Sequence, residues 1–97
     1  MNILFCLTIK EKVITGIEKI EEGGQIILIS TAKASANALE KNIRVMKENT
    51  SKEAAEILLK YELQKKEYST IKDKFKIVSI EFINEGEYCK ITAIYNP

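Results

Sequence analysis

The chain has 97 residues, of which 45% are hydrophobic and 30% charged, enough for one small domain with a single core. Its 15 basic and 14 acidic residues give a net charge of +1, which argues against general binding to DNA, to RNA or to membrane surfaces. There is no histidine, the side chain that most often serves in acid–base catalysis and metal binding. We therefore expect no metal and no cofactor, and assign no catalytic residue.

The two cysteines indicate the compartment. Cys6 and Cys89 lie in apolar runs and not in a CxxC pair, which is typical of small core residues in a reducing environment. The run Asn2–Ile9 is too short for a signal-peptide core with a basic leader, and no run approaches the roughly 20 apolar residues of a membrane span. The sequence therefore predicts a cytoplasmic protein.

The first part of the chain predicts a strand followed by a helix. The run Ile3–Leu7 is continuously apolar, which predicts a strand that ends near Thr8. Apolar residues within 10–22 recur at helical spacing among charged ones, so we predict a helix that the following glycine pair ends. The alternative is a hairpin through residues 21–24, because this segment also contains several β-branched residues.

The stretch Ile26–Ile29 organises the rest of the prediction. It is apolar at four consecutive positions, so both faces of this strand must be covered, which is typical of an interior parallel strand. We therefore predict that residues 2–9 and 25–30 lie side by side and point the same way.

Two helices are predicted after this strand. Ser30 or Thr31 caps a helix over about Ala32–Glu48. A capping box then begins another helix at Ser51, because Thr50 is followed three residues later by a glutamate. The apolar face of this second helix, from Ala54 to Leu63, is wide enough for two packing partners.

A hairpin completes the predicted domain. Phe75–Ile83 and Tyr88–Tyr95 alternate around a turn at 84–87, which predicts an antiparallel pair. The predicted fold class is α/β, a small Rossmann-like β-α-β-α-α-β-β domain with a parallel core pair and a C-terminal antiparallel hairpin, spanning 1–97 as a single domain.

The leading candidate site lies where the two predicted parallel strands end, since open α/β sheets bind ligands beyond the carboxyl ends of their strands. Hydroxyl groups, ammonium groups and helix N-termini at this edge suit a phosphate or another anion. The predicted ligand-binding residues are Thr8, Lys10, Ser30, Thr31 and Lys33. The alternative is that Ser30 and Thr31 only cap a helix and that the lysines are solvated.

Two weaker candidates are charged. The basic stretch from Lys60 to Lys76, with Tyr61 and Tyr68 interleaved, has the composition of a single-stranded nucleic-acid surface, but acidic residues within it favour a solvated helix end. The acidic turn Glu81, Glu85 and Glu87 is interpreted as a charged turn that blunts a sheet edge, rather than as a cation site.

The segments Ile3–Thr8, Val13–Ile17 and Ile26–Lys33 together resemble the opening of CARF domains, the CRISPR-associated Rossmann folds. The resemblance implies a symmetric homodimer that binds a cyclic oligoadenylate, or a similar nucleotide second messenger, across its two-fold axis. It implies that the five residues of the candidate site line the pocket. Some stand-alone members of the family cleave the ring without a metal.

Two functions are therefore expected. The first is a cytoplasmic module that binds a phosphorylated nucleotide, a cyclic oligonucleotide messenger that it sequesters or degrades. The alternative is a homo-oligomeric protein-interaction module without a small ligand, supported by the wide apolar face of 54–63 and by an exposed edge at 88–95.

Overall fold

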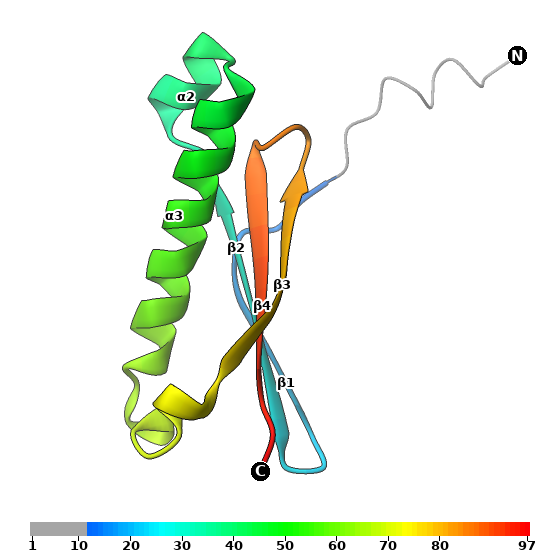
Figure 1. The fold of residues 1–97 in the computed structure, drawn as a ribbon, viewed down its shortest axis with the longest axis vertical. Coiled ribbons are helices and arrows are strands. Elements are labelled where there is room, and N and C mark those ends of the chain that lie inside the picture. The colour runs from blue at the N-terminus through cyan, green and yellow to red at the C-terminus, as the bar shows by residue number, and fades with distance from the viewer. Residues whose placement is uncertain (1–11) are drawn as a thin grey trace, which may run out of the picture.

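The computed structural model describes residues 12–97, which form a four-stranded antiparallel sheet with helices on one side (Figure 1). The strands are β1 (Gly16–Glu22), β2 (Gln25–Lys33), β3 (Lys76–Ile83) and β4 (Tyr88–Tyr95), and their order in the sheet is β1-β2-β4-β3. The helices are α2 (Ala36–Lys41) and α3 (Arg44–Leu63), and the short 3-10 helices η1 (Lys66–Tyr68) and η2 (Lys72–Lys74) lead from α3 to β3. No helix in this part of the chain has the length and apolar character needed to cross a membrane.

The predicted Rossmann-like α/β fold is wrong, because the sheet has no parallel pair among residues 12–97. Strand β2 has an antiparallel neighbour on each side, β1 and β4, so neither of its edges is open to the predicted parallel partner. The strand predicted at Ile3–Leu7 lies outside the described residues. The domain is a small α+β fold, with one main helix packed on an antiparallel sheet.

The helix predicted within 10–22 is wrong in its described part, and the hairpin alternative is confirmed. Residues 16–22 are strand β1, which pairs with β2 from Gly16↔Thr31 to Glu22↔Gln25. The two residues between the strands, Gly23 and Gly24, have φ angles of 58° and 83°. Positive φ at both central residues is what a two-residue type I′ hairpin requires, and glycine adopts it without strain.

The helix boundaries also differ from the prediction. Strand β2 continues to Lys33, so the helix begins later and Ser35, not Ser30 or Thr31, is its cap: the Ser35 Oγ accepts a hydrogen bond from the Ala38 amide at 3.1 Å. Thr50 does not start a new helix, because α3 is continuous through it. Its hydroxyl donates a hydrogen bond of 2.8 Å to the Met46 carbonyl, one turn earlier in α3, and does not cap the start of a helix.

The predicted C-terminal hairpin is present as β3 and β4, joined by a turn in which Asn84, Glu85 and Gly86 all have positive φ. However, β4 lies between β2 and β3 in the sheet. The prediction of an exposed edge at 88–95 is therefore wrong, and the described edge strands are β1 and β3.

Helix α3 covers the two central strands and defines the core. Small side chains on both sides, Ala55 on the helix with Ala93 on β4, allow the helix to approach the sheet closely. The Ser30 hydroxyl donates a buried hydrogen bond of 2.7 Å to the Ala55 carbonyl, which ties β2 to the helix backbone. The buried hydrophobic cluster consists of Leu28, Ala32, Ala55, Leu59, Tyr68, Cys89, Ile91 and Ala93.

Candidate functional site: the open face of the sheet

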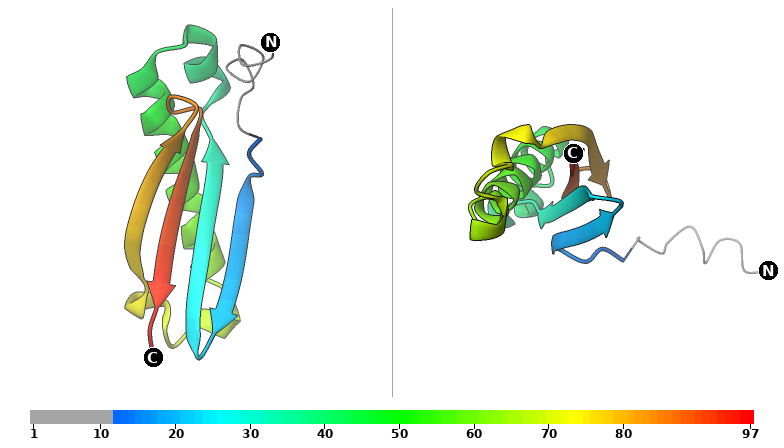
Figure 2. Two further views of the ribbon diagram at one scale, coloured as in Figure 1. Left: turned by 90° about the vertical axis from the view of Figure 1, so that its right-hand side faces the viewer. Right: turned by 90° about the horizontal axis from the view of Figure 1, so that it is seen from below.

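The sheet side that points away from α3 is covered by no described helix. The left view of Figure 2 shows this side, with the strands in front of the helices. Residues paired across an antiparallel sheet point to the same side, so the register assigns each side chain to a side. We call the uncovered side the open face; its residues are Glu18, Ile20, Glu22, Gln25, Ile27, Ile29, Thr31, Lys33, Lys76, Ser79, Glu81, Ile83, Tyr88, Lys90, Thr92 and Ile94.

The centre of the open face is apolar. A single row across the sheet aligns Ile20 of β1 with Ile27 of β2 and Ile94 of β4. Ile29, two residues along β2, continues this surface toward the other end of the strand. Ile20 is 38% exposed, and the other three isoleucines are half-buried.

Two hollows mark opposite corners of the open face. One, of about 190 Å³, lies beside β3 and is lined by Val78 and Ile94 among others. The other, of about 310 Å³, lies beside β1 and is lined in part by Ile29 and Thr31. The surface is therefore uneven, with space at both corners for side chains from a packing partner.

The charges next to the apolar row differ between the two edge strands. Strand β1 contributes the carboxylates of Glu18 and Glu22, on either side of Ile20. Strand β3 contributes Lys76, which lies in the same row as Ile94, and Lys74 lines the same hollow as Lys76. At the apolar row, acidic side chains thus lie at the β1 edge and Lys76 lies at the β3 edge, while Glu81 is farther along β3.

The predicted ligand-binding residues are not gathered at one point in the described structure. Thr8 and Lys10 lie outside the described residues. Ser30 and Thr31 are adjacent in β2 and so point to opposite sides: Ser30 into the core against α3, Thr31 onto the open face. Lys33 is exposed at the end of β2. The prediction needed a parallel strand beside β2, so that both strands would end at the same edge. Both neighbours of β2 are antiparallel, so this edge does not form.

The two weaker candidates are also dispersed. Tyr68, predicted to interleave with the lysines, is fully buried, with its ring edge-on to Phe75 at 5.8 Å between centroids. In the acidic turn, Glu81 pairs across the strands with Lys90. Among residues 12–97, no group of three or more acidic or cysteine side chains is placed to hold a metal ion.

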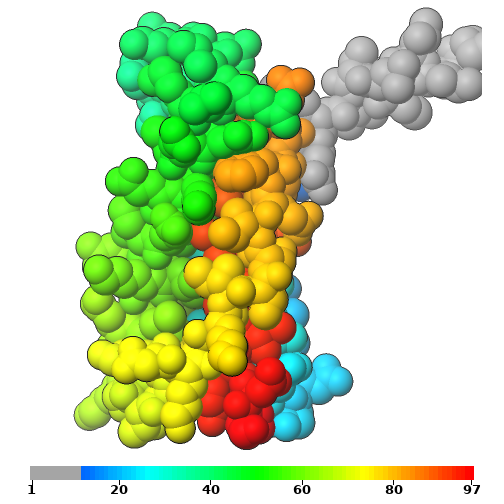
Figure 3. All heavy atoms as spheres, viewed as in Figure 1, coloured from blue at the N-terminus to red at the C-terminus, as the bar shows by residue number. Residues whose placement is uncertain are grey.

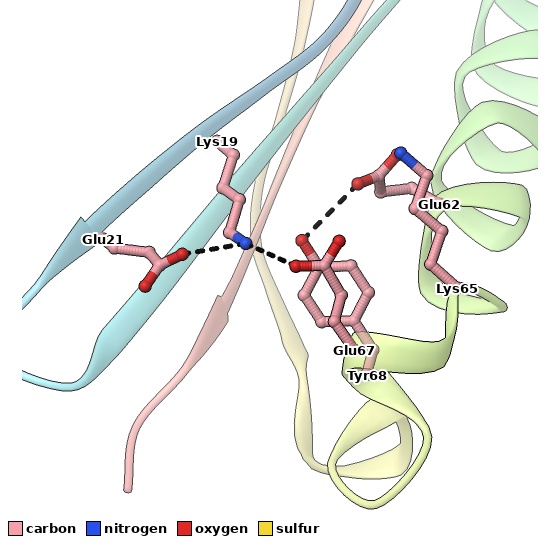
Figure 4. A network of polar contacts seen from close by, with 6 residues as sticks. All are labelled: Lys19, Glu21, Glu62, Lys65, Glu67 and Tyr68. Carbon is pink, nitrogen blue, oxygen red and sulfur yellow. Dashed lines mark hydrogen bonds and ion pairs between the residues drawn. The ribbon is translucent and has the colours of Figure 1, made fainter.

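A network of charges around Lys19 fastens the η1 segment to the sheet, as Figure 4 shows. The Lys19 ammonium lies 2.8 Å from a carboxylate oxygen of Glu21 and 2.8 Å from one of Glu67. It also lies 5.2 Å from the centre of the Tyr68 ring, a cation–π contact. These carboxylates raise the pKa of Lys19 above its usual value, and Lys19 lowers the pKa of Glu67.

The same network continues to α3. The Tyr68 hydroxyl donates to Glu62 at 3.4 Å, and Glu62 forms an ion pair with Lys65 at 3.0 Å. Burial raises the pKa of Tyr68 above its usual value. Because these side chains satisfy one another, we interpret the network as a structural clasp between β1, η1 and the end of α3.

A second uncovered surface lies between α3 and β3. Helix α3 sits over β2 and β4, so Ile77, Ile80 and Phe82 of β3 remain about half exposed beside it. Figure 3 shows atoms of β4 in the furrow between the helix and β3. A cavity of about 410 Å³ at one end of this furrow is lined by both apolar and charged side chains: Glu56, Leu59, Lys60, Leu63, Gln64, Lys72, Asp73 and Ile77. Its charged side chains lie around a lining surface that is mostly apolar.

Sequence reasoning missed the open face. Four consecutive apolar residues, Ile26–Ile29, indicated that both sides of this strand are apolar. The prediction took this to mean that elements of the same domain bury both sides. The structure buries the side that faces α3, whereas on the other side Ile27 and Ile29 are half-buried and Thr31 is buried.

In comparisons with known proteins, no family model, no curated protein and no solved structure matches the chain. These comparisons leave the CARF resemblance and the nucleotide function as predictions.

Proposed function

We propose that the chain is a homo-oligomeric protein-interaction module that binds through its open face. One observation carries this proposal: β2 has isoleucines on both sides, yet among residues 12–97 a helix covers only one side and leaves Ile27 and Ile29 half-buried. A strand with this pattern is stable in water when both sides are shielded. A second protein surface would supply the missing cover for Ile20, Ile27 and Ile94.

The dimensions of the open face support a reversible complex. Four strands about 4.8 Å apart, with about 3.4 Å per residue along strands of 8 residues, give a flat area of roughly 500 Å². Two such faces together bury roughly 1,000 Å², just below the usual range for specific interfaces. We therefore expect a dissociation constant on the order of micromolar.

Nucleotide binding receives less support from the geometry. Of its five predicted residues, Ser30 is already bonded to the Ala55 carbonyl, and Thr31 lies on the other side of the strand. We therefore place protein interaction first, with the cytoplasmic location expected from the sequence as part of the proposal. Within residues 12–97 the thiol of Cys89 is free and buried, in keeping with the reducing compartment expected from the sequence.

The proposal is tested by measuring molar mass against concentration, using sedimentation equilibrium or light scattering. We expect the mass to rise from the monomer value of 11.0 kDa toward twice that value across the micromolar range. Ile27→Glu places a charge at the centre of the open face, so we expect it to remain a monomer throughout.

A matched control uses the other side of the molecule. Ile57→Glu introduces the same residue on α3, where the side chain is already 46% exposed, and should dimerise like the parent. Circular dichroism verifies that both variants fold. A parent chain that stays monomeric up to several hundred micromolar would remove the proposal, as would equal dimerisation of the Ile27→Glu variant.

A further inference from the structure

The distribution of charge on the open face identifies both the partner and its orientation, an inference that rests on the function proposed above. We infer that the open face packs against the open face of a second copy, related by a two-fold axis parallel to the strands. In this arrangement Lys76 of each copy lies between Glu18 and Glu22 of the other.

The argument begins with the two edges of the open face. Glu18 and Glu22 project from β1 at one edge, and Lys76 projects from β3 at the other, with Lys74 beside it in the same hollow. Of the other charges on the open face, Glu81 of β3 is paired directly with Lys90 of β4, and Lys33 lies at the far end of β2. At the apolar row, the open face is thus acidic at the β1 edge and basic at the β3 edge.

Two kinds of two-fold axis can place identical sheets face to face. An axis parallel to the strands exchanges the two edges, so β1 of one copy lies over β3 of the other. An axis across the strands keeps the edges in place, so β1 lies over β1 and β3 over β3. The first arrangement brings opposite charges together, and the second brings Glu18 and Glu22 against the same residues of the partner. Like charges brought together at an interface oppose binding, so the first arrangement is favoured.

The apolar row fits the same arrangement. Exchange of the edges places Ile27 of each copy over Ile94 of the other, since β2 and β4 are the two central strands. Lys76 shares their row and lies at its end, so its aliphatic stem covers Ile20 of the partner. Its ammonium then reaches either neighbouring carboxylate. Face-to-face sheets commonly pack with their strands nearly aligned, as this axis requires.

The test reverses one edge at a time. The first variant combines Glu18→Lys with Glu22→Lys, and the second combines Lys74→Glu with Lys76→Glu. Each places like charges together in its own homodimer, so we expect each to weaken self-association roughly tenfold or more. An equimolar mixture of the two variants restores opposite charges at both edges, and we expect heterodimers with an affinity close to that of the parent. The variant with all four substitutions should also recover the parent affinity.

A control separates edge contacts from net charge. Glu40→Lys with Glu53→Lys makes the same change in net charge as the first variant, at exposed positions on α2 and α3, and should change self-association less than twofold. If each single-edge variant dimerises as well as the parent while Ile27→Glu is monomeric, the orientation is wrong and the proposed function stands. If the parent itself is monomeric, the proposed function fails first.

Discussion

Ile27 of β2 lies directly opposite Ile94 of β4 on the side of the sheet that α3 does not cover. This pair is at the centre of the open face, with Ile20 beside it on β1. The opposite side of the same two strands contributes Leu28 and Ala93 to the buried core. The two central strands are therefore apolar on both sides. We propose that a partner protein covers the side that α3 leaves open.

The first prediction concerns the bond between β2 and α3. Ser30→Ala removes the 2.7 Å hydrogen bond from the buried hydroxyl to the Ala55 carbonyl. We expect the free energy of unfolding to fall by about 1 kcal/mol, since the carbonyl keeps its position in the helix but loses one donor. Urea denaturation measures the change. Ser69→Ala, at an exposed position, serves as control and should change stability by less than about 0.5 kcal/mol.

The second prediction concerns the turn between β3 and β4. Gly86 has a φ of 94°, and a Cβ placed there would lie 2.9 Å from the backbone nitrogen of Glu48. Gly86→Ala should therefore destabilise the fold by more than about 2 kcal/mol, through both backbone strain and a clash with α3. Gly23→Ala is the matched control: its φ is also positive, at 58°, but its Cβ would meet no atom within 4 Å. Equal losses for the two variants would contradict this account of the clash.

The third prediction is a pH dependence at the clasp. Lys19 lowers the pKa of Glu67 in the folded state, so the ion pair stabilises the fold above the ordinary glutamate pKa. This stabilisation is lost as the pH falls through the lowered pKa and the carboxylate is protonated. Thermal unfolding between about pH 2.5 and 7 should show a smaller acid-induced decrease for Glu67→Gln than for the parent. Parallel curves for the two proteins would contradict a role for Glu67 in the clasp.

The fourth prediction concerns the thiol of Cys89. Burial raises its pKa, and its side chain is inaccessible beneath α3. In a Cys6→Ser background, where Cys89 is the only thiol, a thiol reagent should react slowly with the folded protein and rapidly in denaturant. Fast labelling without denaturant at pH 7 would show that the helix does not cover β4 as described.

The sequence predicted the C-terminal hairpin because β4 alternates cleanly: Cys89, Ile91 and Ala93 are buried, and the residues between them are not. Strand β1 gave no such signal. It is an edge strand, and Lys19 points toward the helix side while Ile20 points to the open face, so its apolar residues do not alternate. Helical spacing was then the stronger pattern, although the glycine pair after it is a hairpin turn.

The candidate site was missed for a related reason. Continuous apolar character in Ile26–Ile29 shows that both sides of β2 need cover, but not whether the cover comes from the same chain. The interpretation of this stretch as an interior parallel strand assumed that helices of the same domain cover both sides of it. It therefore placed Ser30 and Thr31 at a ligand-binding edge of the sheet. The antiparallel register instead divides these two residues between the core and the open face.

Isotope-filtered NMR on a mixture of labelled and unlabelled chains tests the central claim most directly, because it detects only contacts between copies. The account predicts intermolecular nuclear Overhauser effects between the methyl groups of Ile27 in one copy and Ile94 in the other, which appear as the concentration rises. Intermolecular contacts confined to α3 or to the furrow beside β3, or none at concentrations where the mass is that of a dimer, would contradict it.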